Sequence, residues 1–162
     1  MSEVPELLER LRRGAEMVAV SITGAAGSEL DYVPEPGKWS IRQIVAHLAD
    51  AEMVAGMRLR RIIAEDNPRI EAFDQNAWAT NLDYARRKTS QALETFRRIR
   101  GENYELLKDL APAAFEREGL HSERGPISLK FLLQLIAEHA ENHAAQLRAR
   151  RAEFKAQKAL NK

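Results

Sequence analysis

The segment Ile136–Leu147, IAEHAENHAAQL, carries two histidines, His139 and His143, four residues apart. An α-helix has about 3.6 residues per turn, so positions four apart share one face, about 6 Å apart along the axis. Two imidazoles at that spacing can both reach one metal ion. The same face carries a row of apolar residues: Leu132, Leu135, Ile136, Ala140 and Leu147. Both rings are therefore expected to point inward, and a third ligand has to come from elsewhere in the chain.

Three further segments have the same helical spacing of apolar residues. With the C-terminal one, the predicted helices cover about residues 5–25, 41–63, 82–110 and 129–154. No segment has the alternating pattern of a β-strand. Long connections are expected at 66–80, with one short helical turn near 74–77, and at 111–127; residues 28–38 form a loop. The sequence thus predicts an all-α protein, a four-helix bundle with crossings between non-adjacent helices.

Two helix starts are clearly marked. Ser40 is a natural N-cap, and Gln43 three residues later completes a capping box. Trp39 and the apolar residue at position 44 occupy the positions of a hydrophobic staple. Ser128 is the expected N-cap of the last helix. These signals fix where the second and fourth helices begin.

The composition is that of an ordinary globular chain. Its 162 residues suggest one domain over 1–162, with a core at about 4–154 and a polar tail at 155–162. The formal charge of +1 gives no general attraction to nucleic acid or anionic lipid. The absence of cysteine excludes disulfides, thiolate ligands and a cysteine nucleophile. No run approaches the roughly 20 apolar residues that span a bilayer and no signal peptide is recognisable, so a cytoplasmic protein is expected.

His47 is the candidate third ligand, because it lies on the apolar stripe of the second helix. A single histidine on such a face is more often a packed, hydrogen-bonded core residue. Three inward histidines in a small bundle satisfy one another poorly, whereas a divalent metal takes one nitrogen from each. Three protein ligands also leave a coordination position open for water or substrate, as catalytic sites do.

The segment from Gly37 to Glu52, GKWSIRQIVAHLADAE, resembles the helix-two signature of the DinB/YfiT-like superfamily. In that family an HxxxH pair follows some ninety residues on, as His139 and His143 follow His47 here, and the resemblance covers about residues 4–154. It implies an up-down-down-up four-helix bundle with two long crossover connections. It also implies a three-histidine site for a divalent metal, with zinc or nickel favoured, held by His47, His139 and His143.

Helical phase suggests which residues orient these ligands. Gln43 precedes His47 by four positions, Asp50 follows it by three, and Gln146 follows His143 by three. Each also has a simpler role as a cap or a solvated polar group. His121, in a segment with glycines and charges, is expected to be a surface residue.

The first functional hypothesis is a divalent-metal-dependent enzyme acting on a small molecule between the helices. Its three-histidine site would activate water or a low-molecular-weight thiol for hydrolysis or transfer, and members of the resembled superfamily with known activities include thiol S-transferases. Because the chain has no cysteine, any thiol must be a cosubstrate. The alternative is a non-catalytic metal- or small-ligand-binding bundle with a stress-linked accessory role. A homodimer is a further expectation from the family, and neither nucleic acid nor membrane is expected as a partner.

Overall fold

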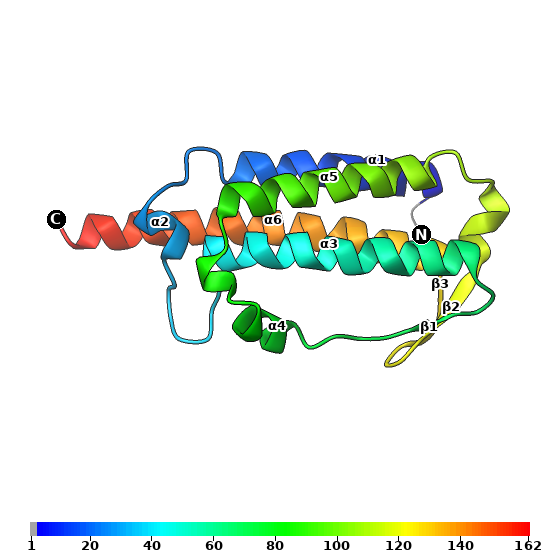
Figure 1. Ribbon diagram of the computed structural model, residues 1–162. Helices are drawn as coiled ribbons and strands as arrows, with labels where there is room; N and C mark the ends of the chain where they lie inside the picture. The colour runs from blue at the N-terminus through cyan, green and yellow to red at the C-terminus, as the bar shows by residue number, and fades with distance from the viewer. Residues whose placement is uncertain (1–2) are drawn as a thin grey trace.

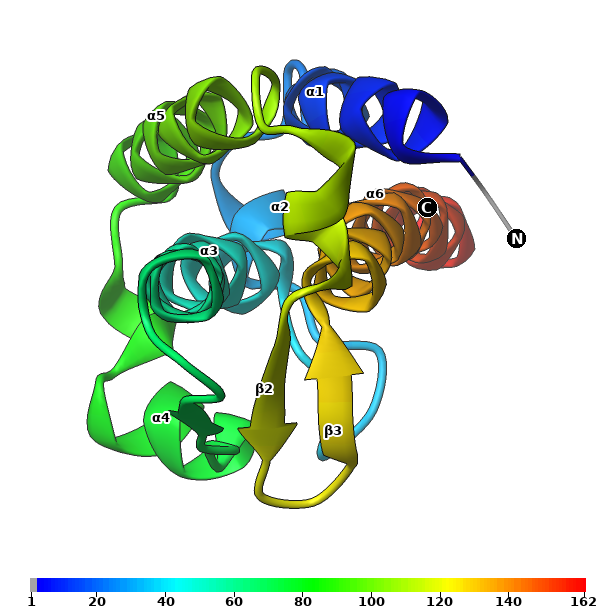
Figure 2. The same ribbon diagram turned by 90° about the vertical axis from the view of Figure 1, so that its right-hand side faces the viewer.

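In the computed structural model, which describes residues 3–162, four long helices make up the molecule (Figure 1). They are α1 (Val4–Ser21), α3 (Ile41–Ala64), α5 (Thr89–Leu107) and α6 (Leu129–Leu160). Helix α1 packs against α6 and α5, and α3 packs against α5 and α6. Viewed end on, α1 and α3 lie on one diagonal of the bundle and α5 and α6 on the other (Figure 2). The predicted four-helix bundle with non-adjacent crossings is confirmed.

The helix directions follow an up-down-down-up order. Helices α1 and α6 run one way along the bundle, and α3 and α5 run the other way (Figure 1). Because α3 and α5 are parallel neighbours, the chain between them has to return along the whole bundle. Residues 65–88 do this on the outside, through strand β1 (Arg69–Ile70), helix α4 (Gln75–Asn81) and the 3₁₀ turn η1 (Tyr84–Arg86).

Both predicted caps are present. The Ser40 hydroxyl accepts a hydrogen bond from the backbone N–H of Gln43, whose side chain accepts one from the Ser40 backbone. The Ser128 hydroxyl accepts from the backbone N–H of Phe131. These side chains satisfy backbone donors that the first helical turn leaves free, so the two ligand-bearing helices start at fixed residues.

The expectation of no strands was wrong. Strand β1 pairs in parallel with β2 (Glu118–His121), and β2 pairs with β3 (Gly125–Ser128) as an antiparallel hairpin. Strands of two to four residues are too short to show an alternating pattern in the sequence. Strand β2 packs tightly against groups far away in the sequence. A Cβ at Gly119 would collide with the side chains of Ile62 and Ile70, so the sheet depends on this tertiary contact.

Several helix boundaries also differ from the expectation. The third long helix starts at Thr89, not near residue 82, because Asp83 has a positive φ of 50°, which interrupts the helical path. It ends at Leu107, three residues short of the expected end. The last helix continues to Leu160 instead of stopping near residue 154, since its end contains good helix formers and neither glycine nor proline. A short helix, α2 (Ser28–Asp31), lies in the segment expected to be a loop.

The core of the bundle has two large apolar clusters with a polar layer between them, and a small third cluster joins Ala46 of α3 to Ala79 and Tyr84. On α3, one large cluster uses residues 41–49 and the other residues 55–62; on α6, these two clusters use residues 140–147 and 129–136. Between them lie Arg100 and Glu52, 1% and 2% exposed, joined by two hydrogen bonds of 2.8 and 3.2 Å. Asn103 donates to the other Glu52 oxygen at 3.0 Å.

Arg100 also donates to the backbone of the remaining two helices. Its guanidinium reaches the carbonyl oxygens of Leu11 on α1, at 3.4 Å, and of Ile136 on α6, at 3.0 Å. Gly14 makes this possible, because a Cβ there would collide with the guanidinium. One side chain on α5 therefore contacts all three other helices of the bundle.

Replacing Glu52 by glutamine should destabilise the fold strongly. The substitution leaves the Arg100 charge buried without a counter-ion, which typically costs about 3–5 kcal/mol. Urea unfolding of the metal-free protein measures the change. The control is Glu94→Gln, which removes an exposed ion pair with Arg98 and should cost less than about 1 kcal/mol. Equal unfolding free energies for the two variants would contradict a central role for the buried pair.

Candidate metal centre

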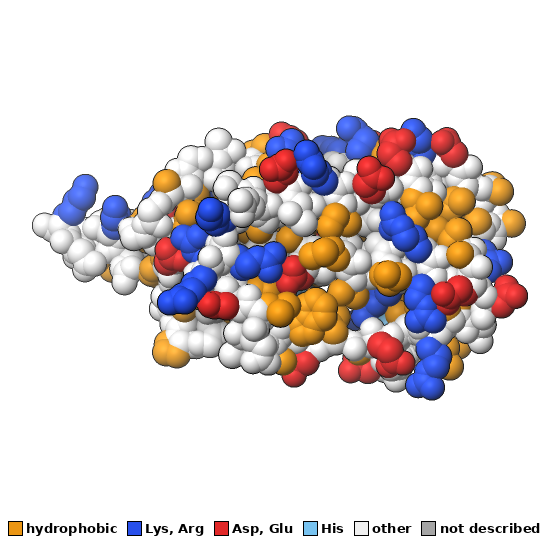
Figure 3. Space-filling view, viewed as in Figure 1, with side chains coloured by type: hydrophobic (Ala, Val, Ile, Leu, Met, Phe, Trp, Pro, Cys, Tyr) orange, Lys and Arg blue, Asp and Glu red, His pale blue; other side chains and the backbone are white. Residues whose placement is uncertain are grey.

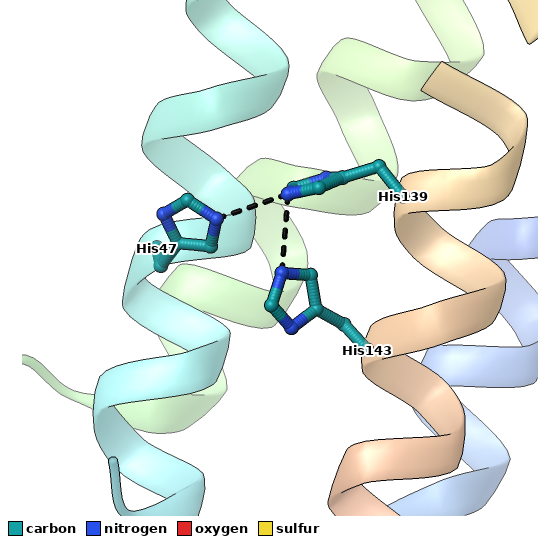
Figure 4. Close-up of side chains that lie close together, drawn as sticks. All are labelled: His47, His139 and His143. Atoms are coloured by element: carbon teal, nitrogen blue, oxygen red, sulfur yellow. Dashed lines mark hydrogen bonds between the residues drawn. The ribbon is translucent and has the colours of Figure 1, made fainter. Parts of the chain in front are cut away.

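The three predicted ligands come together between two packed helices. His47 projects from α3, and His139 and His143 project from α6 (Figure 4). The Nε2 atom of His139 lies 3.0 Å from Nε2 of His47 and 3.1 Å from Nε2 of His143. One ring nitrogen from each of the three histidines lies within 4.8 Å of the other two. The nitrogens converge because the capped start of α3 faces the middle of α6.

Protons alone do not satisfy this arrangement. A neutral imidazole has one N–H and one nitrogen lone pair. If Nε2 of His139 carries the proton, it can donate well to only one of its two neighbours; if it carries the lone pair, that single pair cannot accept two good hydrogen bonds. A cation bound by three lone pairs removes the conflict.

The spacing of the nitrogens fits a small divalent cation. Two nitrogens bound to one zinc ion at about 2.0–2.1 Å lie about 2.9–3.4 Å apart for angles of about 90–110°. The observed separations of 3.0 and 3.1 Å fall within that range. Three imidazoles suit zinc, nickel and other transition metals, so the donor set defines a class of ion and leaves a coordination position free.

Burial keeps the three imidazoles neutral. It lowers the pKa of His47 to about 4, with a smaller contribution from His143. It lowers the pKa of His139 to about 3, helped by the neighbouring histidines and by Arg100. Burial also lowers the pKa of His143, against the opposing effect of its hydrogen bond to Gln146. Neutral rings keep their lone pairs available near pH 7, as metal binding requires.

Of the three residues predicted to orient the ligands, Gln146 forms a hydrogen bond with a histidine of the triad, whereas Gln43 and Asp50 are bonded to other groups. Gln146 Oε1 lies 2.7 Å from Nδ1 of His143, so it can accept the Nδ1–H and leave the Nε2 lone pair facing the site. Gln43 is used in the capping box. Asp50 accepts from the Tyr84 hydroxyl at 2.8 Å and lies 3.4 Å from Arg87. Among residues 3–162, Nδ1 of His47 is buried without a hydrogen-bond partner.

A cavity of about 270 Å³ opens beside His139. Its walls come from α3, from residues 72–75 of the returning connection, from the β2–β3 hairpin and from α6. Apolar side chains that include Phe73, Ile127, Leu132 and Leu135 form much of the lining. The triad therefore meets a cavity of small-molecule size at His139, while His47 is fully buried.

The expectation that His121 is a surface residue was wrong. It ends strand β2, is only 8% exposed and lines the same cavity as His139. It was missed because its burial depends on the short sheet. Arg58 also lines the cavity and was not singled out, although a signal existed: it follows His47 by eleven residues, about three helical turns, and so shares its face of α3.

The fold and this site define a helical-bundle protein with a three-histidine candidate metal centre, and the comparisons place that protein in a family. The model of the DinB superfamily matches residues 7–147, and the chain belongs to that superfamily. Among the part of the chain that the structure describes, no helix is long and apolar enough to span a membrane.

The relatives carry related names. A "putative metal-dependent hydrolase" of Oceanobacillus iheyensis is 34% identical over 119 residues, which cover 74% of this chain and 69% of the relative. The "putative metal-dependent hydrolase YfiT" of Bacillus subtilis is 31% identical over 121 residues, covering 74% and 68%. The solved structure of YfiT, described as a probable metal-dependent hydrolase with an unusual four-helix bundle topology, superposes with a TM-score of 0.88 at 25% identity, covering 96% of this chain and 90% of that one.

Metal analysis of the purified protein should find about one transition-metal ion per chain. His47→Ala and His143→Ala should reduce the bound metal to background, because two nitrogens hold an ion far less tightly than three. His121→Ala is the matched control and should keep the metal. Thermal melting in chelator checks that each variant folds. Near-stoichiometric metal in the His47 and His143 variants would contradict the three-histidine centre.

Acid should destabilise the metal-free protein before its carboxylates titrate. In the unfolded chain the pKa of His47 is near 6.5, whereas in the folded chain burial lowers it to about 4, so the unfolded chain binds a proton at a higher pH. The stabilisation from these neutral histidines is therefore complete above pH 6.5 and decreases as the pH falls toward 4. Urea midpoints between pH 6.5 and about 5, measured with chelator, test this. His139→Leu should flatten the dependence, and an unchanged slope would contradict the assignment.

Proposed function

We propose that this protein is a divalent-metal-dependent enzyme that hydrolyses a small molecule, or transfers a low-molecular-weight thiol to it, in the cavity beside His139. The observation that carries the proposal is that His139 belongs both to the triad and to the cavity wall. A structural metal site is usually closed by its ligands, whereas catalytic sites keep a position open to reactants. The names of the relatives support metal-dependent hydrolysis as the first reaction to test.

The residues of this chain have separable tasks in that proposal. His47, His139 and His143 would hold the ion, and Gln146 would keep the His143 ring in the tautomer that presents Nε2. A divalent ion bound there would lower the pKa of bound water or thiol and polarise an electrophile. The apolar walls of the cavity would limit the access of bulk water to the reacting groups.

The source of the nucleophile separates the two versions of the reaction. The chain contains no cysteine, so a thiol nucleophile has to enter with a cosubstrate. A cavity of about 270 Å³ is slightly smaller than most ligand-binding pockets, which favours small reactants. Water needs no such room, and hydrolysis is therefore the simpler version of the proposal.

Activity should depend on the metal and on its ligands. The zinc- or nickel-loaded protein is incubated with a panel of small esters, amides and electrophiles, with and without a low-molecular-weight thiol. The expected result is a product whose rate falls at least about 100-fold after chelation or in His143→Asn, because losing a metal-bound nucleophile typically costs several kcal/mol of barrier. Gln146→Leu should weaken metal affinity by about 10- to 100-fold, as removal of an orienting partner does.

Glu94→Gln serves as the activity control, since Glu94 is exposed on α5, a helix that carries none of the three histidines. A rate increase that requires thiol would select transfer over hydrolysis. Stoichiometric metal without turnover of any compound, or rates that chelation leaves unchanged, would overturn the enzymatic proposal, and the first of these results would favour the non-catalytic binding bundle.

A further inference from the structure

The cavity beside His139 has a wall of hydrogen-bond donors that the metal centre does not use. Arg58 on α3 and His121 at the end of β2 both line it, with Arg124 on the exposed hairpin turn. Two carboxylates also line it. Glu52 is already engaged by Arg100 and Asn103, and Glu123 is exposed on the hairpin. The donors on this wall therefore face the cavity without a buried counter-ion of their own.

Arg58 is a half-buried guanidinium with most of its donors free. Its Nη2 donates to the backbone oxygen of Glu71, and the group lies 5.8 Å from the centre of the Phe73 ring. Within residues 3–162 it forms no ion pair with a carboxylate. A guanidinium has five N–H donors in a planar fork that matches carboxylate and phosphate oxygens. One backbone contact leaves the rest of that fork available.

The pKa values separate Arg58 from arginines that have partners. Burial alone lowers the pKa of Arg58. Carboxylate hydrogen bonds raise the pKa values of Arg10 and Arg42, through Glu141 and Asp31. A desolvated cation without a counter-ion is costly, and such a group in a cavity is a candidate for binding an anion.

His121 presents a second donor on the same wall. Its Nδ1 accepts from the backbone N–H groups of Glu123 and Arg124, at 3.1 and 3.3 Å. Because Nδ1 is the acceptor, the proton of the neutral ring is on Nε2. Burial, and then the charges of Arg58 and Arg124, lower the pKa of His121 and keep the ring neutral. Within residues 3–162, Nε2 of His121 has no hydrogen-bond partner. Unlike Nδ1 of His47, it is not fully buried, so a ligand can reach it.

We propose that Arg58 and the Nε2–H of His121 bind an anionic oxygen group, carboxylate or phosphate, of a small substrate whose other end reaches His139. This inference rests on the proposed function only in taking the cavity as the substrate site. The substrate class is a short organic anion, because one wall supplies a fork of charged donors and the remaining walls are largely apolar.

Binding to the metal-free protein tests the anion site without any reaction. Sodium succinate and inorganic phosphate are titrated separately while NMR follows the His121 ring and the Arg58 guanidinium. One of the two should shift both groups, and its identity distinguishes carboxylate from phosphate. Arg58→Gln should weaken that binding at least about 10-fold, the loss expected for a charge-assisted hydrogen bond, and Arg58→Lys should weaken it less. The control Arg98→Gln changes an exposed arginine outside the cavity and should bind as the wild type does. No shift with either anion, or equal binding by Arg58→Gln, would overturn the proposal.

A kinetic comparison on the metal-loaded protein separates this inference from the proposed function. The substrates are two esters with the same leaving group, one carrying a free carboxylate (4-nitrophenyl succinate) and one neutral (4-nitrophenyl butyrate). The ratio of their kcat/KM values should favour the anionic ester, fall at least about 10-fold in Arg58→Gln and stay unchanged in Arg98→Gln. A ratio that survives Arg58→Gln would overturn the anion site while leaving hydrolysis intact. Hydrolysis of neither ester would count against the proposed function, and the binding titration would still decide the anion site.

Discussion

The buried ion pair of Arg100 and Glu52 is the contact on which the rest of the bundle depends. It joins α5 to α3, and the same guanidinium bonds to backbone carbonyls of α1 and α6. The apolar clusters on either side define the relative height of the helices less strictly, because hydrophobic burial is not directional. A buried charge with fixed donors defines it strictly, since any shift would leave the charge unpaired. This layer therefore sets the heights of the four helices relative to one another.

The metal centre depends on that alignment. Arg100 bonds to the carbonyl oxygen of Ile136, less than one turn before His139, and Glu52 lies five residues after His47. The contact that holds α3 and α6 in register thus also determines which histidine of α6 meets His47. The positive charge of Arg100 further lowers the pKa of His139, which helps to keep that ring neutral. Structure and site chemistry here share one network.

The parts outside the bundle turn a metal-binding core into a candidate binding site. Charged side chains of both signs are interspersed with hydrophobic ones over the face in Figure 3, and no single-sign region covers it. The donors of Arg58 and His121 are instead gathered in the cavity, which the returning connection and the β2–β3 hairpin complete. Because connections vary more readily than packed helices, specificity in such a bundle can change while the metal ligands stay in place.

The sequence by itself determined the presence and order of the four long helices, two of their caps and the three histidines. Ser40 with Gln43, Ser128 and the spacing of His139 and His143 act within one or two helical turns, so their geometry follows from the chain alone. The bundle was predictable because apolar periodicity marks inward faces, and His47 could be matched to the pair because it lies on such a face. Tertiary structure alone decided the three short strands, the burial of His121 and the pairing of Arg100 with Glu52. Each of these depends on groups far apart in the chain, and no local sequence pattern predicts which group a buried charge or a short strand will pair with.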